Sequence, residues 1–351
     1  MQRIDVHCHV VTPSYRQYAI NHGHEHPDGM PDFPAWSPEA HIALMEKLDI
    51  DKSIMSISSP GTHLTPGRDE EAVRMTCQFN KELSGICRLH YSHLAFFASL
   101  PMPCVEGSVA EIDHALDVLG AVGFAVLSNA NGVYLGDKAL DPVFAKLNER
   151  KAVVLIHPTI SNVSPKTGDV SGSGDTEATR PLPQYPGPMM EFMFDETRVV
   201  ANLLLSGTIA RYPNITYIMS HSGCALPSLV DRIGGFAAIQ SGVATEMNQG
   251  GEELRRLLRE RFYFDLAGFP FPTRSMDCSE YWEKVGRRGF SMQQIGRLLP
   301  RKWPFHSRSR WIKAAKGFSM GTKEARFTLG MQINSLISRN YKQQLRLAIL
   351  I

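Results

Sequence analysis

The sequence has no apolar run of the roughly 18 to 20 residues that a membrane-spanning helix needs. Its first residues lack the charged segment followed by an apolar segment that is typical of a signal peptide. The six cysteines include no C-x-x-C pair, which favours reduced thiols over a disulfide framework. We also find no repeat of fixed period. These absences predict a globular protein of the cytosol, without a membrane partner.

The composition is that of an ordinary folded protein, with 43% hydrophobic and 21% charged residues. A length of 351 residues suits one main α/β domain. The charge is unevenly distributed: residues 273–351 contain 16 Lys and Arg but only 4 Asp and Glu, out of 37 and 35 in the whole chain. A basic segment of this kind can indicate binding to nucleic acid or to a membrane surface.

Short apolar runs with the length of buried parallel strands alternate with helical patterns. This alternation predicts a (β/α) barrel or a doubly wound sheet. The segment 161–187 is rich in Gly, Ser, Thr and Pro and predicts a long loop. The predicted strands are Arg3–Val10, Asp51–Ile57, Leu94–Leu100, Val122–Leu127, Ala152–Ile156, Ile215–Met219 and Phe262–Leu266, and the predicted helices are Ser37–Leu48, Arg68–His90, Ser108–Leu119, Asp141–Arg150, Glu191–Ala210 and Pro227–Gln240.

Four histidines coincide with these strands. His7 and His9 lie two residues apart on the first strand, so their side chains point the same way and can hold one ion between them. His157 and His221 follow the apolar runs of two later strands. In a parallel barrel the carboxyl ends of all strands meet on one face, where active sites are built. Imidazole suits Zn²⁺ and related divalent ions, so the pattern predicts a metal centre.

Three segments around these histidines carry a family resemblance: Ile4-Asp-Val-His-Cys-His9, Ile156-His-Pro158 and Ser220-His-Ser-Gly223. They resemble the amidohydrolase-related decarboxylases, a group that includes aminocarboxymuconate-semialdehyde, γ-resorcylate and fungal 6-methylsalicylate decarboxylases. The chain is most similar to the 6-methylsalicylate type. Further similarity lies in Pro34-Ala-Trp-Ser37, Ser56-Ile-Ser-Ser-Pro-Gly61, the segment from Phe194 to Leu203, and the segment from Phe262 to Gly268.

The resemblance implies a (β/α)8 TIM-like barrel of the metal-dependent hydrolase type. It further implies that His7, His9 and His157 bind Zn²⁺ or another divalent ion such as Mn²⁺, and that His221 is the catalytic acid or base. The implied reaction is decarboxylation of a small aromatic carboxylic acid, here 6-methylsalicylate to m-cresol and CO₂ in fungal polyketide secondary metabolism. A homodimer is expected on the same grounds.

The resemblance ends at about residue 272, and beyond it the family's metal-binding Asp is missing. Lys302 stands where that Asp is expected, before Trp303-Pro-Phe305. An alternative reading frame across residues 326–334 can be back-translated to Tyr-Phe-Gly-Asn-Ala-Asn-Lys, which resembles the family's C-terminal motif. We therefore divide the chain into a barrel, residues 1–272, and a divergent basic tail, residues 273–351, with the hypothesis that a frameshift or a mispredicted intron produced the tail. Its charge then predicts no nucleic-acid partner.

Five further residues are candidates for the site. His22, His24 and His26 fall in a loop and could bind metal or cover a substrate. Arg198 could pair with a substrate carboxylate or form an ion pair within the barrel. Asp265 could reach the metal, orient one of its ligands, or cap a strand end.

Several functions stay open at this point. Other hydroxybenzoates or aminocarboxymuconate semialdehyde could be the substrate. A related hydrolase would use a metal-bound hydroxide on an ester, lactone or amide. The chain could also be an inactive relative that lacks the metal-binding Asp.

Overall fold

The computed structural model describes residues 3–163, 177–239, 250–265 and 267. Within this part of the chain, seven parallel strands form one sheet in the order β1-β2-β3-β4-β7-β10-β11, which is also their order in the sequence. The strands are β1 (Ile4–Val10), β2 (Lys52–Ile57), β3 (Leu94–Ala98), β4 (Gly123–Leu127), β7 (Val153–His157), β10 (Thr216–Met219) and β11 (Phe262–Phe264).

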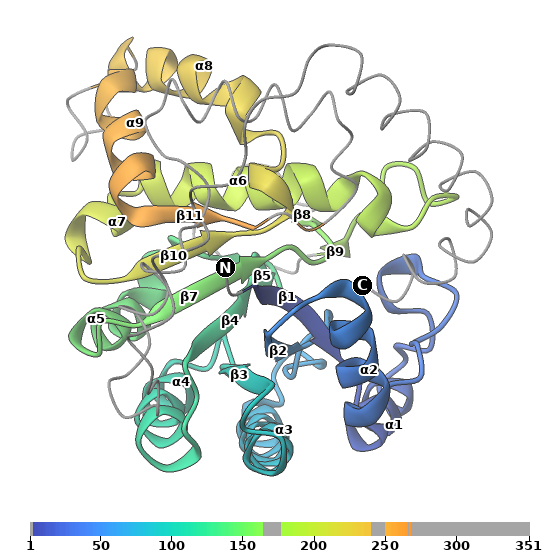
Figure 1. Cartoon of the computed structure of the whole chain (residues 1–351). Helices are drawn as coiled ribbons and strands as arrows, with labels where there is room; N and C mark the ends of the chain where they lie inside the picture. The colour runs from blue at the N-terminus through green and yellow to red at the C-terminus, as the bar shows by residue number, and fades with distance from the viewer. Residues whose placement is uncertain (1–2, 164–176, 240–249, 266, 268–351) are drawn as a thin grey trace, which may run out of the picture. The chain divides into compact units, whose positions relative to one another are not determined.

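The sheet curls so that its two outer strands approach each other. His7 lies on β1 at one edge of the sheet, and Asp265 directly follows β11 at the other, yet their side chains are 2.6 Å apart. Figure 1 shows the strands at the centre with α3, α4 and α5 outside them. The prediction of a (β/α)8 TIM-like barrel is confirmed, with seven of its strands among the described residues. The predicted tail, residues 273–351, lies outside those residues.

Helices follow most strands, as a barrel requires. Ser37 caps α2 by accepting a hydrogen bond from the backbone N–H of Ala40 at 3.2 Å, as the predicted start at Ser37 and Pro38 implies. The helices are α1 (Pro13–Asn21), α2 (Pro38–Leu48), α3 (Asp69–Leu89), α4 (Val105–His114), α5 (Asp141–Glu149), α6 (Glu191–Leu205), α7 (Thr208–Arg211), α8 (Leu226–Ile239) and α9 (Gly250–Arg261).

The helices differ from prediction at three places. The predicted helix Glu191–Ala210 is wrong as one element, because Gly207 with φ of 75° separates α6 from α7. Helix α4 begins at Val105 instead of Ser108, and a π-helical turn, η2 (Ala115–Leu119), continues it. Helices α1 and α9 were not predicted, since one is only nine residues long and the other is dominated by charged side chains.

The predicted loop 161–187 contains a short antiparallel pair, β8 (Asn162–Val163) with β9 (Glu177–Ala178). Residues 164–176 between these strands lie outside the described residues. A second two-residue pair, β5 (Asn129–Ala130) with β6 (Val133–Tyr134), follows β4. Both pairs therefore sit in connections that leave the carboxyl ends of barrel strands.

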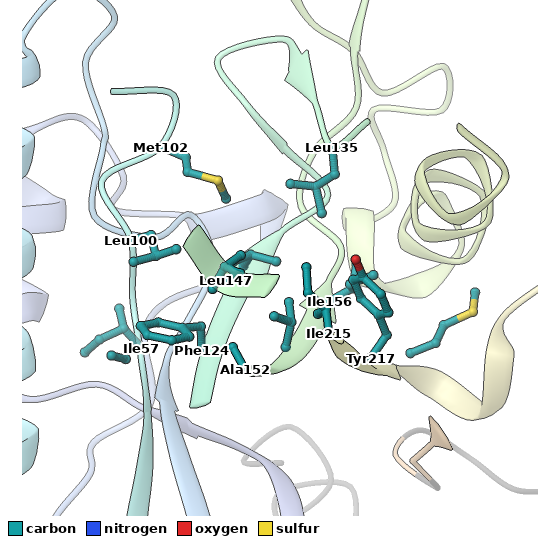
Figure 2. Close-up of a cluster of buried hydrophobic side chains, with 14 of the residues drawn as sticks. Ile57, Leu100, Met102, Phe124, Leu135, Leu147, Ala152, Ile156, Ile215 and Tyr217 are labelled. Carbon is teal, nitrogen blue, oxygen red and sulfur yellow. The ribbon is translucent and has the colours of Figure 1, made fainter. Parts of the chain in front are cut away.

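Apolar side chains from strands and helices pack together and fix the strand ends in space. All five residues of β3 and all five of β7 are buried, as expected of strands covered on both faces. Figure 2 shows Phe124 of β4, Ile156 of β7 and Leu147 of α5 in one cluster. Because Ile156 directly precedes His157, this packing also fixes the position of that histidine.

No helix in the described part of the chain is long and apolar enough to cross a membrane.

Candidate metal centre

The four histidines selected from the sequence come together at the carboxyl ends of the strands. His7 and His9 come from β1, His157 ends β7, and His221 begins the turn after β10. The ring centroids of His7 and His9 are 5.0 Å apart, and those of His9 and His157 are 4.7 Å apart. His221 lies 4.9 Å from His7 and 5.6 Å from His157 by the same measure. The convergence predicted from a parallel barrel is thus observed.

The donor atoms of His7, His9 and His157 fit a single metal ion. One ring nitrogen of each lies within 4.8 Å of the others, and the Nε2 atoms of His7 and His9 are 3.2 Å apart. Two imidazole lone pairs at this separation suit a shared cation. The Nδ1 atom of His9 is buried and has no hydrogen-bond partner among the described residues. The Nδ1 atoms of His7 and His157 each have one.

Hydrogen bonds on the far side of the rings orient two of these ligands. The Nδ1–H of His7 donates to the Asp265 carboxylate at 2.6 Å, and the Nδ1–H of His157 donates to the carbonyl oxygen of Pro158 at 2.6 Å. Metal-binding histidines characteristically donate their other ring N–H to a carboxylate or a backbone carbonyl, which fixes the tautomer. Both rings therefore keep Nε2 for an ion.

The pKa values of two of the histidines also suit a metal ligand. Burial, together with the neighbouring imidazoles His7 and His221, lowers the pKa of His9 to about 3. Burial and the neighbouring imidazoles of His9, His7 and His221 lower the pKa of His157 well below its usual value. Burial acts in the same direction on His7, but Asp265 outweighs it and raises its pKa. His9 and His157 are therefore neutral donors at physiological pH.

Asp265 makes contacts that match one of its predicted roles. Besides the His7 ring, its carboxylate accepts the backbone N–H of His221 at 2.8 Å. Burial raises the pKa of Asp265, but the charge and hydrogen bond of His7 outweigh it, so the net pKa is lowered. One ionised carboxylate thus connects a candidate metal ligand with the candidate catalytic residue.

A second buried carboxylate, which the sequence did not reveal, contacts His221. Glu196 on α6 lies 3.3 Å from the Nδ1 of His221, accepts the backbone N–H of Ser220 at 2.5 Å, and accepts the thiol of Cys224 at 3.1 Å. The side chain is fully buried, and burial raises its pKa. The sequence contains a signal for this carboxylate, because Asp195 and Glu196 are adjacent acidic residues within a mainly apolar helix.

The turn that carries His221 has a strained backbone. His221, Ser222 and Cys224 have φ values of 52°, 56° and 53°, a region that residues other than glycine seldom adopt. Glu196 and Asp265 bind the backbone N–H groups of Ser220 and His221, which holds the turn in this form. Such conformations persist where the surroundings over-determine them, and they concentrate at functional sites.

Arg198, predicted to contact a substrate carboxylate, has partners within the barrel. Its Nη1 donates to the Asp195 carboxylate at 2.6 Å and to the Ser161 hydroxyl at 3.2 Å. Asp195 is fully buried and also accepts the hydroxyl groups of Ser128 and Tyr134. The alternative of an ion pair within the barrel matches these contacts.

The three loop histidines do not come together. His22 donates to the carbonyl oxygen of Tyr18 at 2.7 Å, and His26 to that of Pro31 at 2.7 Å. The pKa of His24 is lowered by burial, against a hydrogen bond with the backbone of Leu64. Within the described part of the chain, none of the three belongs to a group of metal-binding side chains.

Comparison with known proteins defines the class. A family model described as amidohydrolase matches residues 4–273, so the chain belongs to the amidohydrolase family. The expected relationship to its decarboxylases is confirmed as well. The chain is 32% identical to decarboxylase macB of Penicillium terrestre over 236 residues, which cover 66% of this chain and 67% of the relative. It is 30% identical to the 6-methylsalicylic acid decarboxylase of Penicillium expansum, covering 76% of this chain and 77% of the relative.

A solved structure shows the same fold. The 5-carboxyvanillate decarboxylase of Novosphingobium aromaticivorans, with bound manganese, superposes with a TM-score of 0.66 at 20% identity. The match covers 80% of this chain and 83% of that one. At this identity the likeness supports the barrel fold.

Proposed function

We propose that the chain is a metal-dependent decarboxylase that removes the carboxylate of a small aromatic acid without oxidation. The observation that carries the proposal is the convergence of His7, His9, His157 and His221 on one face of the barrel, where five of their ring pairs have centroid distances of 4.7 to 5.6 Å. The named decarboxylases among the relatives supply the reaction class.

In this proposal three imidazoles hold the ion and the fourth handles the proton. His7, His9 and His157 would bind a divalent cation, Zn²⁺ or Mn²⁺, through Nε2. When bound, the ion would supply Lewis acidity toward the substrate carboxylate or an ortho oxygen, which would help to fix the orientation of the ring.

His221 is the proposed acid. In the reaction the bond between the ring carbon and the carboxylate breaks, CO₂ leaves, and a proton binds to the same ring carbon. Glu196 accepts the Nδ1–H of His221, so Nε2 is the nitrogen that can deliver the proton. The exchange is balanced without an oxidant, a reductant or an organic cofactor.

We propose 6-methylsalicylate as the substrate, with m-cresol and CO₂ as products. The support is the 30% identity to a 6-methylsalicylic acid decarboxylase over three quarters of the chain. The homodimer, the cytosolic location and the choice of Zn²⁺ over Mn²⁺ stay predictions.

The test combines metal analysis with product identification on the full chain. The purified protein is loaded with Zn²⁺ or Mn²⁺ and incubated with 6-methylsalicylate, and in parallel with γ-resorcylate and with ester and lactone substrates. We expect CO₂ and m-cresol in equal amounts from 6-methylsalicylate, and no hydrolysis products. His157→Ala should lose both the ion and the activity, whereas His26→Ala, which removes a histidine outside the cluster, should keep both.

The other outcomes are distinct. Release of CO₂ only from another hydroxybenzoate would support the decarboxylase function but identify a different substrate. Hydrolysis without CO₂ would replace the reaction by that of a metal-dependent hydrolase. A folded chain that binds neither ion and turns over nothing would identify an inactive relative.

A further inference from the structure

A second group of metal-binding side chains lies between two outer helices. Cys77 comes from α3, and Glu111 and His114 come from α4. Their ligand atoms lie within 4.8 Å of one another, with Cys77 Sγ 4.0 Å and Glu111 Oε2 3.1 Å from His114 Nδ1. We propose that these residues bind a second divalent ion, of the Zn²⁺ type, independently of the four strand-end histidines.

The spacing on α4 places two ligands on one face of the helix. Glu111 and His114 are three residues apart, and side chains at this separation are neighbours on a helix surface. Glu-x-x-His is a spacing that helical proteins use to bind metal ions. Directly after His114 the helix changes to the π-helical turn η2, a rare element that is frequent at functional sites.

A buried amide holds the Glu111 carboxylate in place. Asn80 of α3 donates its Nδ2–H to Glu111 Oε1 at 2.8 Å. The amide is itself fixed, because it also donates to the carbonyl oxygen of Ser99 at 3.0 Å and accepts the backbone N–H of Ser99 at 2.9 Å. Metal-binding carboxylates are typically oriented by hydrogen bonds of this kind. The other oxygen, Oε2, then faces His114 and is available to an ion.

The chemistry of the three donors favours a borderline-soft cation. A thiolate, a carboxylate and a neutral imidazole form a mixed set, and sulfur selects Zn²⁺ over hard ions such as Mg²⁺. The two anions would balance the charge of the ion. The Glu111 side chain is only 8% exposed, but that of His114 is 28% exposed, so an ion and a water ligand can enter from solvent.

The experiment uses Co²⁺ as a spectroscopic substitute for Zn²⁺ in the full chain. A cysteine thiolate bound to Co²⁺ gives a near-ultraviolet charge-transfer absorption that an all-histidine site does not give. Wild type should show this band, and Cys77→Ser should lose the band together with one bound ion per chain. Cys87→Ser, on the same helix but in no metal-binding group of the described residues, is the matched control and should keep both. His157→Ala should also keep the band, because it affects only the other site.

Two further variants make the result decisive. His114→Ala changes a partly exposed side chain and should lose the band even if Cys77→Ser proves unstable, with folding checked by circular dichroism. Cys224→Ser tests the one other thiol that belongs to a metal-binding group among the described residues, beside Glu196 and His221. The proposal is overturned if wild type shows no band, if His114→Ala keeps it while folded, or if Cys224→Ser alone removes it.

Discussion

Two groups of histidines in this protein differ in how sequence distance relates to distance in space. His22, His24 and His26 are neighbours in the sequence, yet they form hydrogen bonds with three separate parts of the backbone. His9 and His157 are 148 residues apart, yet their rings lie 4.7 Å from each other. Position at the end of a barrel strand therefore indicates a site better than a local cluster of metal-binding residue types does.

The position of the anchored rings in the barrel, and not the anchoring itself, accounts for the difference. Each of the rings of His7, His157 and His221 has its Nδ1 bound to a carboxylate or carbonyl, so each presents Nε2. His22 and His26 are anchored through Nδ1 in the same way, but of these two groups of histidines only the strand-end group has ligand atoms close enough to hold one ion.

The largest effect is expected from removing a strand-end ligand. His9→Ala should abolish tight metal binding and reduce decarboxylation to background, because two imidazoles hold an ion poorly. His24→Ala should keep the metal content and activity of wild type. Elemental analysis and a CO₂ assay measure both variants. If His9→Ala and His24→Ala lost metal and activity equally, the strand-end histidines would not differ in function from the loop histidines.

Removing the proposed acid should separate catalysis from metal binding. For His221→Ala we expect kcat to fall by roughly 10² to 10⁴-fold, the usual contribution of a positioned general acid or base. The ion should remain bound with unchanged stoichiometry. If this variant loses its metal in proportion to its activity, His221 is a ligand and another group supplies the proton.

The two buried carboxylates should have different effects. Asp265→Asn weakens the anchor of His7, and loss of such a partner typically lowers metal affinity by roughly 10 to 100-fold. Competition with a chelator measures this change. Glu196→Gln should lower kcat and alter its pH profile with little change in metal affinity, since its contacts are with the His221 turn. Thermal melts control for misfolding, and identical effects of the two variants would contradict the assignment.

The smallest effect on activity is expected at Arg198. Its side chain is 53% exposed, but its partner Asp195 is 0% exposed, so Arg198→Ala should lower stability by more than the roughly 1 kcal/mol of an exposed pair, because a buried carboxylate loses its cation. KM for the aromatic acid should change less than about twofold if the pair is only structural, and denaturant unfolding with initial-rate kinetics gives both values. A large rise in KM at unchanged kcat would instead support the predicted contact with the substrate carboxylate.

The alternation of strands and helices and the strand-end positions of the histidines were predictable from simple patterns, whereas the choice of a barrel over a doubly wound sheet depended on the family resemblance. A run such as Val153–Ile156 is short and wholly apolar, so it indicates a buried strand and places His157 at the carboxyl end of that strand. The topology of parallel strands then brings such ends together.

Other features depend on three-dimensional contacts that periodicity does not contain. Glu196 is one of two adjacent acids on α6, and nothing in the sequence tells which of them contacts His221 and which contacts Arg198. The π-helical turn after His114 adds one residue to a helical turn without any distinctive residue type. The break between α6 and α7 lies at Ser206 and Gly207. The apolar pattern continues on both sides of it, so the sequence was interpreted as one helix.

The central claim is that strand ends far apart in the sequence hold one ion. The most direct measurement is an anomalous-scattering map from crystals of the Mn²⁺- or Zn²⁺-loaded protein. We expect a peak bonded to the Nε2 atoms of His7, His9 and His157 at about 2.0 to 2.2 Å, with His221 close by and not bonded. No peak there in crystals of a loaded, folded chain, or a peak only at His22, His24 and His26, would contradict the account.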